Sequence, residues 1–262
     1  MTVRDALRSS GIDPREARLL LAQAAGFSEA SVVAFPDREI PAAVEMFFSR
    51  QVARRKNGEP IAYIVGRKEF YGLELAVNPA VLIPRPETEL LVELALQRSF
   101  SSVADLGTGS GALALAIKKH RPQARVVAVD SSAAALEVAK RNSARLGVAL
   151  ELRHGRWWDL LEGERFDLVV ANPPYVAAGD AHLPELRFEP GIALVSGADG
   201  LDAIREIARG APAHLAPGGW LLVEHGLGQQ AAVCALLAEA GLDSVASWPD
   251  LSGIPRVAGG RR

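Results

Sequence analysis

From residue 87 onward, short apolar runs alternate with longer segments that have the periodicity of amphipathic helices. This alternation is typical of strands joined by crossover helices, which give a largely parallel sheet with helices on both faces. The runs are almost continuously apolar, as expected for strands that are buried on both faces. We therefore expect an α/β fold with a seven-stranded, mostly parallel sheet, whose strands are SVADLG, RVVAVD, ALELRHG, FDLVVANPPY, WLLVEHG, SVASWPD and PRVAGG.

The N-terminal part has a helical pattern without a chemical motif. Asp13-Pro14 is typical of a helix start and Gly26 of its end, and Pro41 opens a further helix. Residues 60–84 are rich in β-branched and aromatic residues between turn formers, which predicts a β-hairpin connector. A chain of 262 residues, 49% of them apolar, suits one catalytic and one small accessory domain. We expect a helical domain at 1–59, the connector at 60–84 and the sheet domain at 85–262.

Charge and cysteine usage exclude several classes of protein. A protein that grips long nucleic acid usually has a basic surplus, so the net charge of −2 argues against stable nucleic-acid binding. No run has the length of about 18 apolar residues that a membrane helix needs, and the N-terminal segment lacks the apolar stretch of a signal peptide. Cys234 is the single cysteine, and its apolar helical surroundings predict a buried structural thiol. We expect a cytoplasmic protein that does not bind membranes.

A glycine-rich turn follows the first strand of the sheet domain and opens a helix, and it reads Gly107, Thr108, Gly109, Ser110, Gly111. Glycines there let the backbone turn sharply and approach a ligand closely. Asp130 ends the next strand, where a carboxylate can accept hydrogen bonds from ribose hydroxyls. The spacing is neither GxGxxG nor that of a P-loop, which favours a nucleoside without a pyrophosphate, such as S-adenosylmethionine. A ligand-free glycine turn is the alternative.

A second motif, Asn172, Pro173, Pro174, Tyr175, directly follows the apolar strand LVVA, at a strand end where such sheets bind ligands. An amide nitrogen is a poor nucleophile because its lone pair is delocalised. The Asn172 side-chain oxygen and the Pro173 carbonyl can accept two N–H bonds and stabilise the positive charge that develops on this nitrogen. Tyr175 can stack on the planar group. The motif predicts methyl transfer to an amide or amino nitrogen, against the alternative of an ordinary Asn-Pro turn.

Together, GTGSG, the acidic residue after the second strand and NPPY resemble the class I methyltransferases that modify exocyclic or amide nitrogens. Four further segments narrow the resemblance to the peptide chain release factor glutamine methyltransferases, the HemK/PrmC family: LIPRPETE, FEP, LLVEHG and RVAGGR. This resemblance covers nearly the whole chain. It implies a Rossmann-like fold behind a small helical domain and a hairpin. It also implies methylation of the glutamine in the GGQ motif of bacterial class I release factors, which supports translation termination.

Residue by residue, the resemblance implies that the glycine turn, Asp130, Trp157 and Asn172 hold S-adenosylmethionine. It implies that Asn172, Pro173, Pro174 and Tyr175 hold the glutamine, with Asn172, Pro173 and Tyr175 as the catalytic residues. Simple core packing is the alternative for Trp157. The segment Arg85–Thr88 matches a stretch near the cleft, and the helical domain is expected to recognise the release factor. One departure is Arg156, because the family commonly has an acidic residue there; if that residue touched the adenine, the contact is lost or replaced.

The other polar residues point to no competing chemistry. The five histidines lack metal-ligand spacing, so we expect no metal, and a structural hydrogen bond is the favoured interpretation of His225. Asp105 can orient the cofactor or brace the glycine turn. Methylation of amino groups in DNA or RNA remains the alternative function, although it normally needs a basic groove and a means of flipping the base. A non-catalytic binding module would be expected to have degraded motifs, and both are intact. We expect a monomer.

Overall fold

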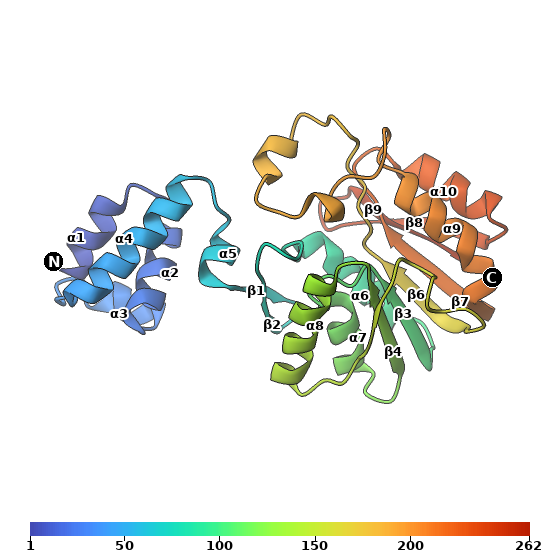
Figure 1. Ribbon diagram of the computed structural model, residues 1–262, viewed down its shortest axis with the longest axis horizontal. Helices are drawn as coiled ribbons and strands as arrows, with labels where there is room; N and C mark the ends of the chain where they lie inside the picture. The colour runs from blue at the N-terminus through green and yellow to red at the C-terminus, as the bar shows by residue number, and fades with distance from the viewer. The chain divides into compact units, whose positions relative to one another are not determined.

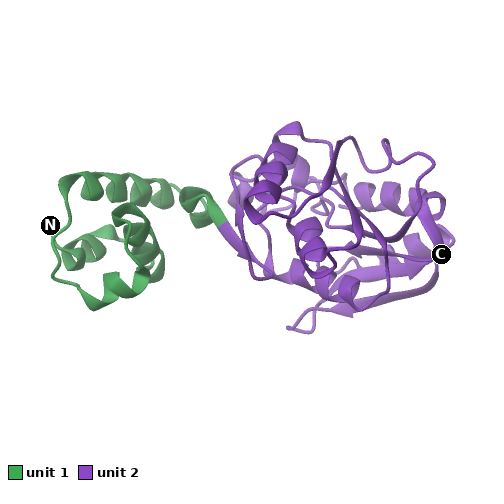
Figure 2. Cartoon of the chain, turned by 90° about the horizontal axis from the view of Figure 1, so that it is seen from below, with its two compact units in different colours: residues 1–67 green, residues 68–262 purple.

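The computed structural model describes residues 1–262 and divides them into two compact units, Met1–Arg67 and Lys68–Arg262 (Figure 2). The first unit is entirely helical up to its last residue, and the second contains the large sheet. None of the helices combines the length and the apolar character that a membrane crossing requires.

The helical unit is organised around its own apolar core. Asp13 caps the second helix by accepting from the backbone N–H groups of Arg15 and Glu16, and Gly26 ends that helix in the left-handed conformation, as predicted. Leu20, Leu21 and other apolar side chains of several helices form one buried cluster. The helices are α1 (Val3–Ser10), α2 (Pro14–Ala25), α3 (Glu29–Ala34), α4 (Ala42–Lys56) and α5 (Ile61–Val65).

The segment predicted as a β-hairpin connector, 60–84, differs from the prediction at its start. Ile61–Val65 is the short helix α5, which follows Pro60 and ends at Gly66 with φ of 78°. Pro suits a helix start and a left-handed glycine suits its end, so these two flanking residues override the β-branched and aromatic composition between them. The hairpin follows, with strands β1 (Arg67–Phe70) and β2 (Leu73–Ala76).

The second unit contains the predicted seven-stranded α/β sheet (Figure 1). The strand order is β5-β4-β3-β6-β7-β9-β8. The first five strands are parallel, and β9 runs antiparallel to both β7 and β8, which confirms the mostly parallel sheet. The strands are β3 (Ser102–Leu106), β4 (Arg125–Asp130), β5 (Glu151–His154), β6 (Phe166–Ala171), β7 (Leu215–Glu224), β8 (Asp243–Pro249) and β9 (Pro255–Arg261).

Helices cover both faces of this sheet, and each face has its own core. One buried cluster joins α6 and α7 to strand residues such as Val103 and Val126. The other joins α9 and α10 to the alternate strand residues, such as Ala104 and Val127. The alternation follows from the opposite directions of successive side chains in a strand. The helices are α6 (Glu89–Leu96), α7 (Ala112–His120), α8 (Ala133–Leu146), α9 (Asp202–His214) and α10 (Gln230–Glu239), with short 3₁₀ turns η1 (Pro86–Thr88), η2 (Leu183–Leu186) and η3 (Gly191–Ala193).

The strand order creates one position where the connections diverge. From the central strand β3 the chain proceeds to β4 on one side, and β6 pairs with β3 on the other. In such sheets a ligand crevice forms beyond the carboxyl ends of the strands at this point of reversal. The glycine turn after β3, Asp130 at the end of β4 and Asn172 after β6 all lie at these carboxyl ends.

Candidate active site

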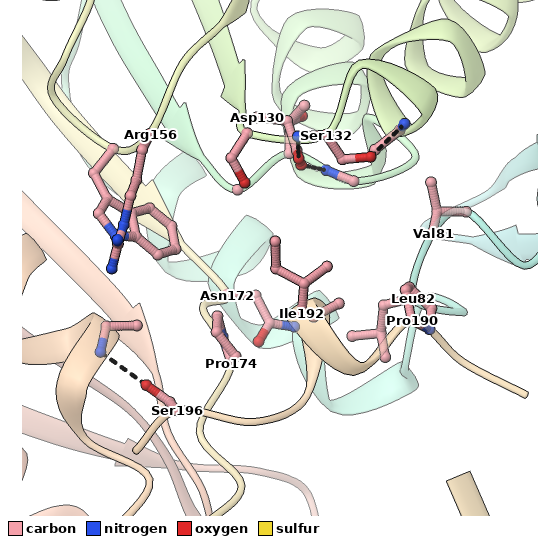
Figure 3. Close-up of a pocket in the computed structure, with 18 of the residues that line it drawn as sticks. Val81, Leu82, Asp130, Ser132, Arg156, Asn172, Pro174, Pro190, Ile192 and Ser196 are labelled. Carbon is pink, nitrogen blue, oxygen red and sulfur yellow. Dashed lines mark hydrogen bonds between the residues drawn. The ribbon is translucent and has the colours of Figure 1, made fainter. Parts of the chain in front are cut away.

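A cavity of about 490 Å³ lies at the carboxyl ends of the parallel strands. Figure 3 shows Asp130 and Ser132 on one side of it and Asn172, Pro174 and Ile192 on the other. We call these two sides the glycine-turn wall and the Asn172 wall. Residues of the predicted motifs that line the cavity are Gly107, Thr108, Gly109, Ser110, Asp130, Trp157, Asn172 and Pro174.

The glycine turn is held by local hydrogen bonds. The backbone N–H groups of Gly107 and Thr108 both donate to the Val129 carbonyl, at 2.9 and 3.0 Å. The φ angles of Gly107, Gly109 and Gly111 lie between 56° and 84°, a region that other residues rarely adopt. Gly111 differs from the others because it does not line the cavity; a Cβ there would lie 3.3 Å from that of Ala139 in α8. Its absence of a side chain therefore serves the packing of α7 on α8.

Asp130 is fixed by the turn that it faces. Its Oδ2 accepts from the Gly109 N–H and its Oδ1 from the Ser132 N–H, both at 2.8 Å. Burial raises the pKa of this carboxyl, and these two hydrogen bonds oppose the shift. A carboxylate that lines a cavity and is already held by backbone N–H groups is suited to accept further hydroxyl hydrogens without moving.

Asp105 braces the glycine turn from beneath. Its Oδ2 accepts from the Thr108 hydroxyl at 2.7 Å and from the Ala114 N–H at 3.2 Å, while its Oδ1 is buried without a partner. Burial raises the pKa of Asp105 to about 7. Because Asp105 does not line the cavity, the geometry supports the bracing role that the sequence left open.

Trp157 packs directly on the glycine turn. A Cβ on Gly107 would lie 3.2 Å from the Trp157 ring, so this close approach requires glycine. Trp157 itself has φ of 45°, an uncommon conformation for an aromatic residue, and its indole N–H is buried without a partner. The ring therefore belongs both to the apolar core and to the cavity lining.

Arg156, at the position where the sequence resemblance implies an acidic residue, forms an ion pair at the cavity. Its guanidinium lies 2.5 Å from the carboxylate of Glu206 on α9. Both residues line the cavity, and both side chains are at least 40% exposed. An acidic group, Glu206, thus reaches this part of the cavity from a different element of the chain.

Asn172 lies on the opposite wall with one polar atom satisfied and one free. Its Nδ2 donates to the Thr88 hydroxyl at 3.0 Å. Its Oδ1 is buried and has no hydrogen-bond partner. An unpartnered buried acceptor is costly, with a desolvation penalty of about 1–3 kcal/mol, and it is retained in functional sites where a ligand donates to it.

The rest of the NPPY motif is divided between the cavity and the core. Pro174 also lines the cavity, whereas Pro173 and Tyr175 do not, and Pro173 is buried. The Tyr175 hydroxyl donates to Oε1 of Glu224 at 3.3 Å, and the Gln229 side chain donates to the Tyr175 carbonyl at 3.0 Å. Burial is the main reason that the pKa of Tyr175 is raised. The predicted stacking of Tyr175 on a substrate stays a prediction.

Two segments that carried the sequence resemblance meet beside the cavity. Arg85 of LIPRPETE pairs with Glu189 of FEP, and the other oxygen of Glu189 accepts from the Ile83 N–H at 3.1 Å. Glu189 is almost fully buried. The pair holds Leu82 and Pro84 next to Pro190, and these three residues line the cavity.

The remaining single residues have structural surroundings. His225 is buried, and its Nδ1 lies 3.0 Å from the Gly226 carbonyl, which confirms the favoured structural hydrogen bond. Cys234 is only half-buried against the core, so the prediction of a buried thiol was wrong in degree; it lies on α10, whose outer face remains exposed.

Sequence reasoning missed one functional candidate, Glu224, which is buried at the end of β7. Thr88 was placed near the cleft, but its contact with Asn172 was not predicted. A charged residue at the end of an otherwise apolar strand, LLVE, is a signal that could have identified Glu224. Ile192, Ser196 and Glu206 also line the cavity, but their sequence contexts contain no comparable signal.

Two family models match this chain. Residues 86–185 match the methyltransferase small domain, and residues 2–66 match the PrmC N-terminal domain. Among solved structures, a methyltransferase from Pyrococcus furiosus superimposes with a TM-score of 0.59 at 20% identity, covering 81% of this chain and 98% of that one. A likeness at this identity shows the fold alone.

Curated relatives are similar over nearly the full length. The release factor glutamine methyltransferase of Xylella fastidiosa (strain Temecula1 / ATCC 700964) is 52% identical, with 95% of this chain and 94% of the relative covered. That of Neisseria gonorrhoeae is 48% identical, with 100% and 98% covered. At this identity and coverage, the chain belongs to the release factor glutamine methyltransferases.

Proposed function

We propose that this protein transfers a methyl group from S-adenosylmethionine to the side-chain amide nitrogen of a glutamine, and that this glutamine is the one in the GGQ motif of class I release factors. The observation that carries the proposal is the buried, unpartnered Oδ1 of Asn172 on one wall of the cavity. A primary amide has two N–H donors, and such a donor is what this acceptor lacks.

The glycine-turn wall fits the methyl donor. S-Adenosylmethionine supplies an electrophilic methyl group and has a ribose with two hydroxyls and a flat adenine. Asp130 offers carboxylate lone pairs to the ribose, and Gly107 and Gly109 leave room for a close approach to the backbone. The Trp157 ring and its unpartnered indole N–H supply an apolar surface with a polar edge.

The Asn172 wall fits the acceptor nitrogen. In the proposed reaction, the amide nitrogen forms a bond to the methyl carbon while the carbon–sulfur bond breaks with its electrons on sulfur. The cationic nitrogen, now strongly acidic, then releases one proton to solvent water. Asn172 Oδ1 accepts a hydrogen bond from one N–H group and stabilises the positive charge that develops on nitrogen. The Pro173 carbonyl, which does not line the cavity, stays a predicted second acceptor. Holding both reactants in line is itself worth about 7–11 kcal/mol of barrier. A strong general base is therefore unnecessary.

We assign release-factor recognition to the helical unit. It has its own apolar core and still exposes Val33, Phe35, Met46 and Phe47. Exposed apolar side chains of this kind are common at protein–protein interfaces. We further propose that the protein acts as a monomer in the cytoplasm, where ribosomes terminate translation, and that it forms no stable complex with nucleic acid.

Mass spectrometry of unmethylated release factor incubated with the protein and S-adenosylmethionine tests the proposal. We expect a mass gain of one methyl group on the glutamine of GGQ. A matched release factor with Gln→Asn at that position should gain nothing, because the shorter side chain cannot place its nitrogen equally. Parallel incubations with DNA and RNA test the alternative substrates. Methyl transfer to nucleic acid without transfer to release factor would overturn the proposal.

A further inference from the structure

A buried carboxylate stands behind the Asn172 wall and is not used by the chemistry above. Glu224, at the end of β7, is 1% exposed. Its Oε1 accepts from the Tyr175 hydroxyl at 3.3 Å, and the neighbouring Thr88 hydroxyl lowers the pKa of the carboxyl. Its Oε2 has no hydrogen-bond partner. A single buried carboxylate therefore interacts with Tyr175, the last residue of the NPPY motif, and with Thr88, which contacts Asn172, the first.

The Thr88 hydroxyl connects Glu224 to Asn172, because it contacts both side chains. A hydroxyl has one hydrogen, and because an ionised carboxylate can only accept, the Thr88 hydroxyl beside it directs that hydrogen at Glu224. The Thr88 oxygen can then only accept, and it does so from Asn172 Nδ2 at 3.0 Å. If the Asn172 amide were turned over, its Oδ1 would face the Thr88 oxygen with no hydrogen between them. The chain of donors thus forces Oδ1 to the other side, where it is unpartnered.

We propose that Glu224 and Thr88 are positioning residues that fix the direction of the Asn172 amide, so that the site presents an acceptor and selects a substrate nitrogen that donates hydrogen bonds. Glu224 holds Tyr175 in the same way. This inference rests on the proposed transfer to a glutamine amide. It explains why a site for a neutral side chain keeps a carboxylate buried behind it, since an ionised carboxylate can only accept hydrogen bonds.

The arrangement depends on the ionisation of Glu224. Burial raises the pKa of Glu224 to about 7, opposed by hydrogen bonds from Thr88 and Tyr175. A protonated Glu224 carries its own hydrogen and can donate to Thr88, which frees the Thr88 hydrogen for Asn172 and removes the constraint. The fixed orientation is present above this pKa and is lost as the pH falls through it. Other charged or titratable groups around the carboxylate are Glu87 in η1, His225 beside it, and Arg256 on β9, which pairs with Asp250.

Matched variants separate positioning from packing. Thr88→Val keeps the shape of the side chain and removes the hydroxyl, and Thr88→Ser keeps the hydroxyl and removes a methyl group. We expect Thr88→Val and Glu224→Gln to lower kcat for release-factor methylation by about 10-fold to 100-fold. Thr88→Ser should stay within about 3-fold of wild type. Binding of S-adenosylmethionine by isothermal titration calorimetry should change by less than about 3-fold in all three. Equal losses in Thr88→Val and Thr88→Ser would overturn the proposal.

The pH profile gives a second readout that a packing role would not change. If only the ionised form is active, kcat of the wild type should fall about 10-fold between pH 8 and pH 6, since one unit on each side of a pKa near 7 changes the ionised fraction by that factor. Glu224→Gln should lose this dependence. A wild-type profile that persists in Glu224→Gln would contradict the assignment.

A measurement without release factor keeps this inference distinct from the proposed function. The chain has four asparagines, so selective ¹⁵N-asparagine labelling gives few side-chain amide signals by NMR. The Asn172 signal is assigned by its loss in Asn172→Asp. We expect this signal to titrate near pH 7 in the wild type and to stop doing so in Glu224→Gln. A signal that is insensitive to pH in the wild type would refute the positioning chain even if methyl transfer is observed.

Discussion

The two walls of the cavity are built by different kinds of contact. On the glycine-turn wall, Asp130 accepts hydrogen bonds from Gly109 and Ser132, and Asp105 accepts one from Thr108. The two residues of each pair are at most 21 positions apart in sequence. On the Asn172 wall, Asn172 bonds Thr88, which is 84 residues away, and Tyr175 bonds Glu224, which is 49 residues away. The first wall is therefore set by local chain geometry, and the second is assembled by the tertiary fold.

The walls also differ in the acceptor that each presents to the cavity. Both oxygens of Asp130 already accept backbone hydrogen bonds, whereas Asn172 Oδ1 accepts none. A preorganised acceptor with a free lone pair is what stabilisation of a developing charge needs. The difference suggests that one wall holds a ligand in place and that the other acts on the reacting atom. Each prediction below tests this division of labour.

The largest expected effect is that of Asn172→Ala. Because the variant removes an acceptor aimed at the reacting nitrogen, kcat should fall by about 100-fold to 1,000-fold, the usual loss for one preorganised group. The Kd of S-adenosylmethionine, measured by calorimetry, should change by less than about 3-fold. If Asn172→Ala had a normal kcat at saturating S-adenosylmethionine, Asn172 would instead act in donor binding. The two walls would then not have the separate roles of binding and catalysis.

The next effect concerns the stability of the glycine-turn wall. Gly111→Ala combines a φ of 84° with a Cβ only 3.1 Å from Leu115 and 3.3 Å from Ala139. We expect the free energy of unfolding in urea to fall by about 2–4 kcal/mol, from the left-handed backbone and the overpacking together. Gly109→Ala is the matched control, since its Cβ would meet nothing within 4 Å, and should cost about 1–2 kcal/mol. Equal losses of unfolding free energy in the two variants would mean that α7 and α8 can shift to accommodate the added methyl group.

Asp130→Ala should act on donor binding and leave the chemistry intact. Loss of the carboxylate removes an acceptor facing the cavity, so the Kd of S-adenosylmethionine should rise by about 10-fold to 100-fold, the equivalent of one or two charge-assisted hydrogen bonds. At saturating donor, kcat should stay within about 3-fold. Asp167→Ala is the control, because Asp167 also accepts backbone N–H groups, from Ser101 and Ser102, at the other end of the strands. A fall in kcat that saturation does not rescue would break the comparison.

The same contrast explains what could be predicted from the sequence. The alternating pattern located all seven strands, and the glycine turn and Asp130 could be placed at one sheet edge because the carboxyl ends of parallel strands share that edge. These are consequences of local pattern and of general topology. The helix Ile61–Val65 was missed because its composition favours a strand and only its flanking residues, Pro60 and Gly66, indicate a helix.

The residues of the Asn172 wall could be predicted from the sequence, but their hydrogen-bond partners could not. The motif identified Asn172, yet nothing in the sequence pairs it with Thr88 or pairs Tyr175 with Glu224, because these contacts depend on how η1 and β7 meet in the fold. The positive φ of Trp157 is likewise set by its packing on Gly107 and has no local signal. A general rule gives the position of a strand end, but the direction of a side-chain amide depends on partners that only the fold brings together.

The smallest expected effect is that of Arg156→Ala, at the position where the sequence departs from the pattern that its resemblance implies. The Arg156–Glu206 pair is largely exposed, and such pairs contribute about 0–1 kcal/mol because water and salt screen them. The Kd of S-adenosylmethionine should therefore change by less than about 5-fold, and kcat should not change. Calorimetry at low and high salt checks the reason, since screening should remove whatever effect remains. A change in Kd larger than 10-fold would mean that donor binding requires Arg156 to hold Glu206, which is 50 residues away in sequence. The glycine-turn wall would then depend on the tertiary fold as much as the Asn172 wall does.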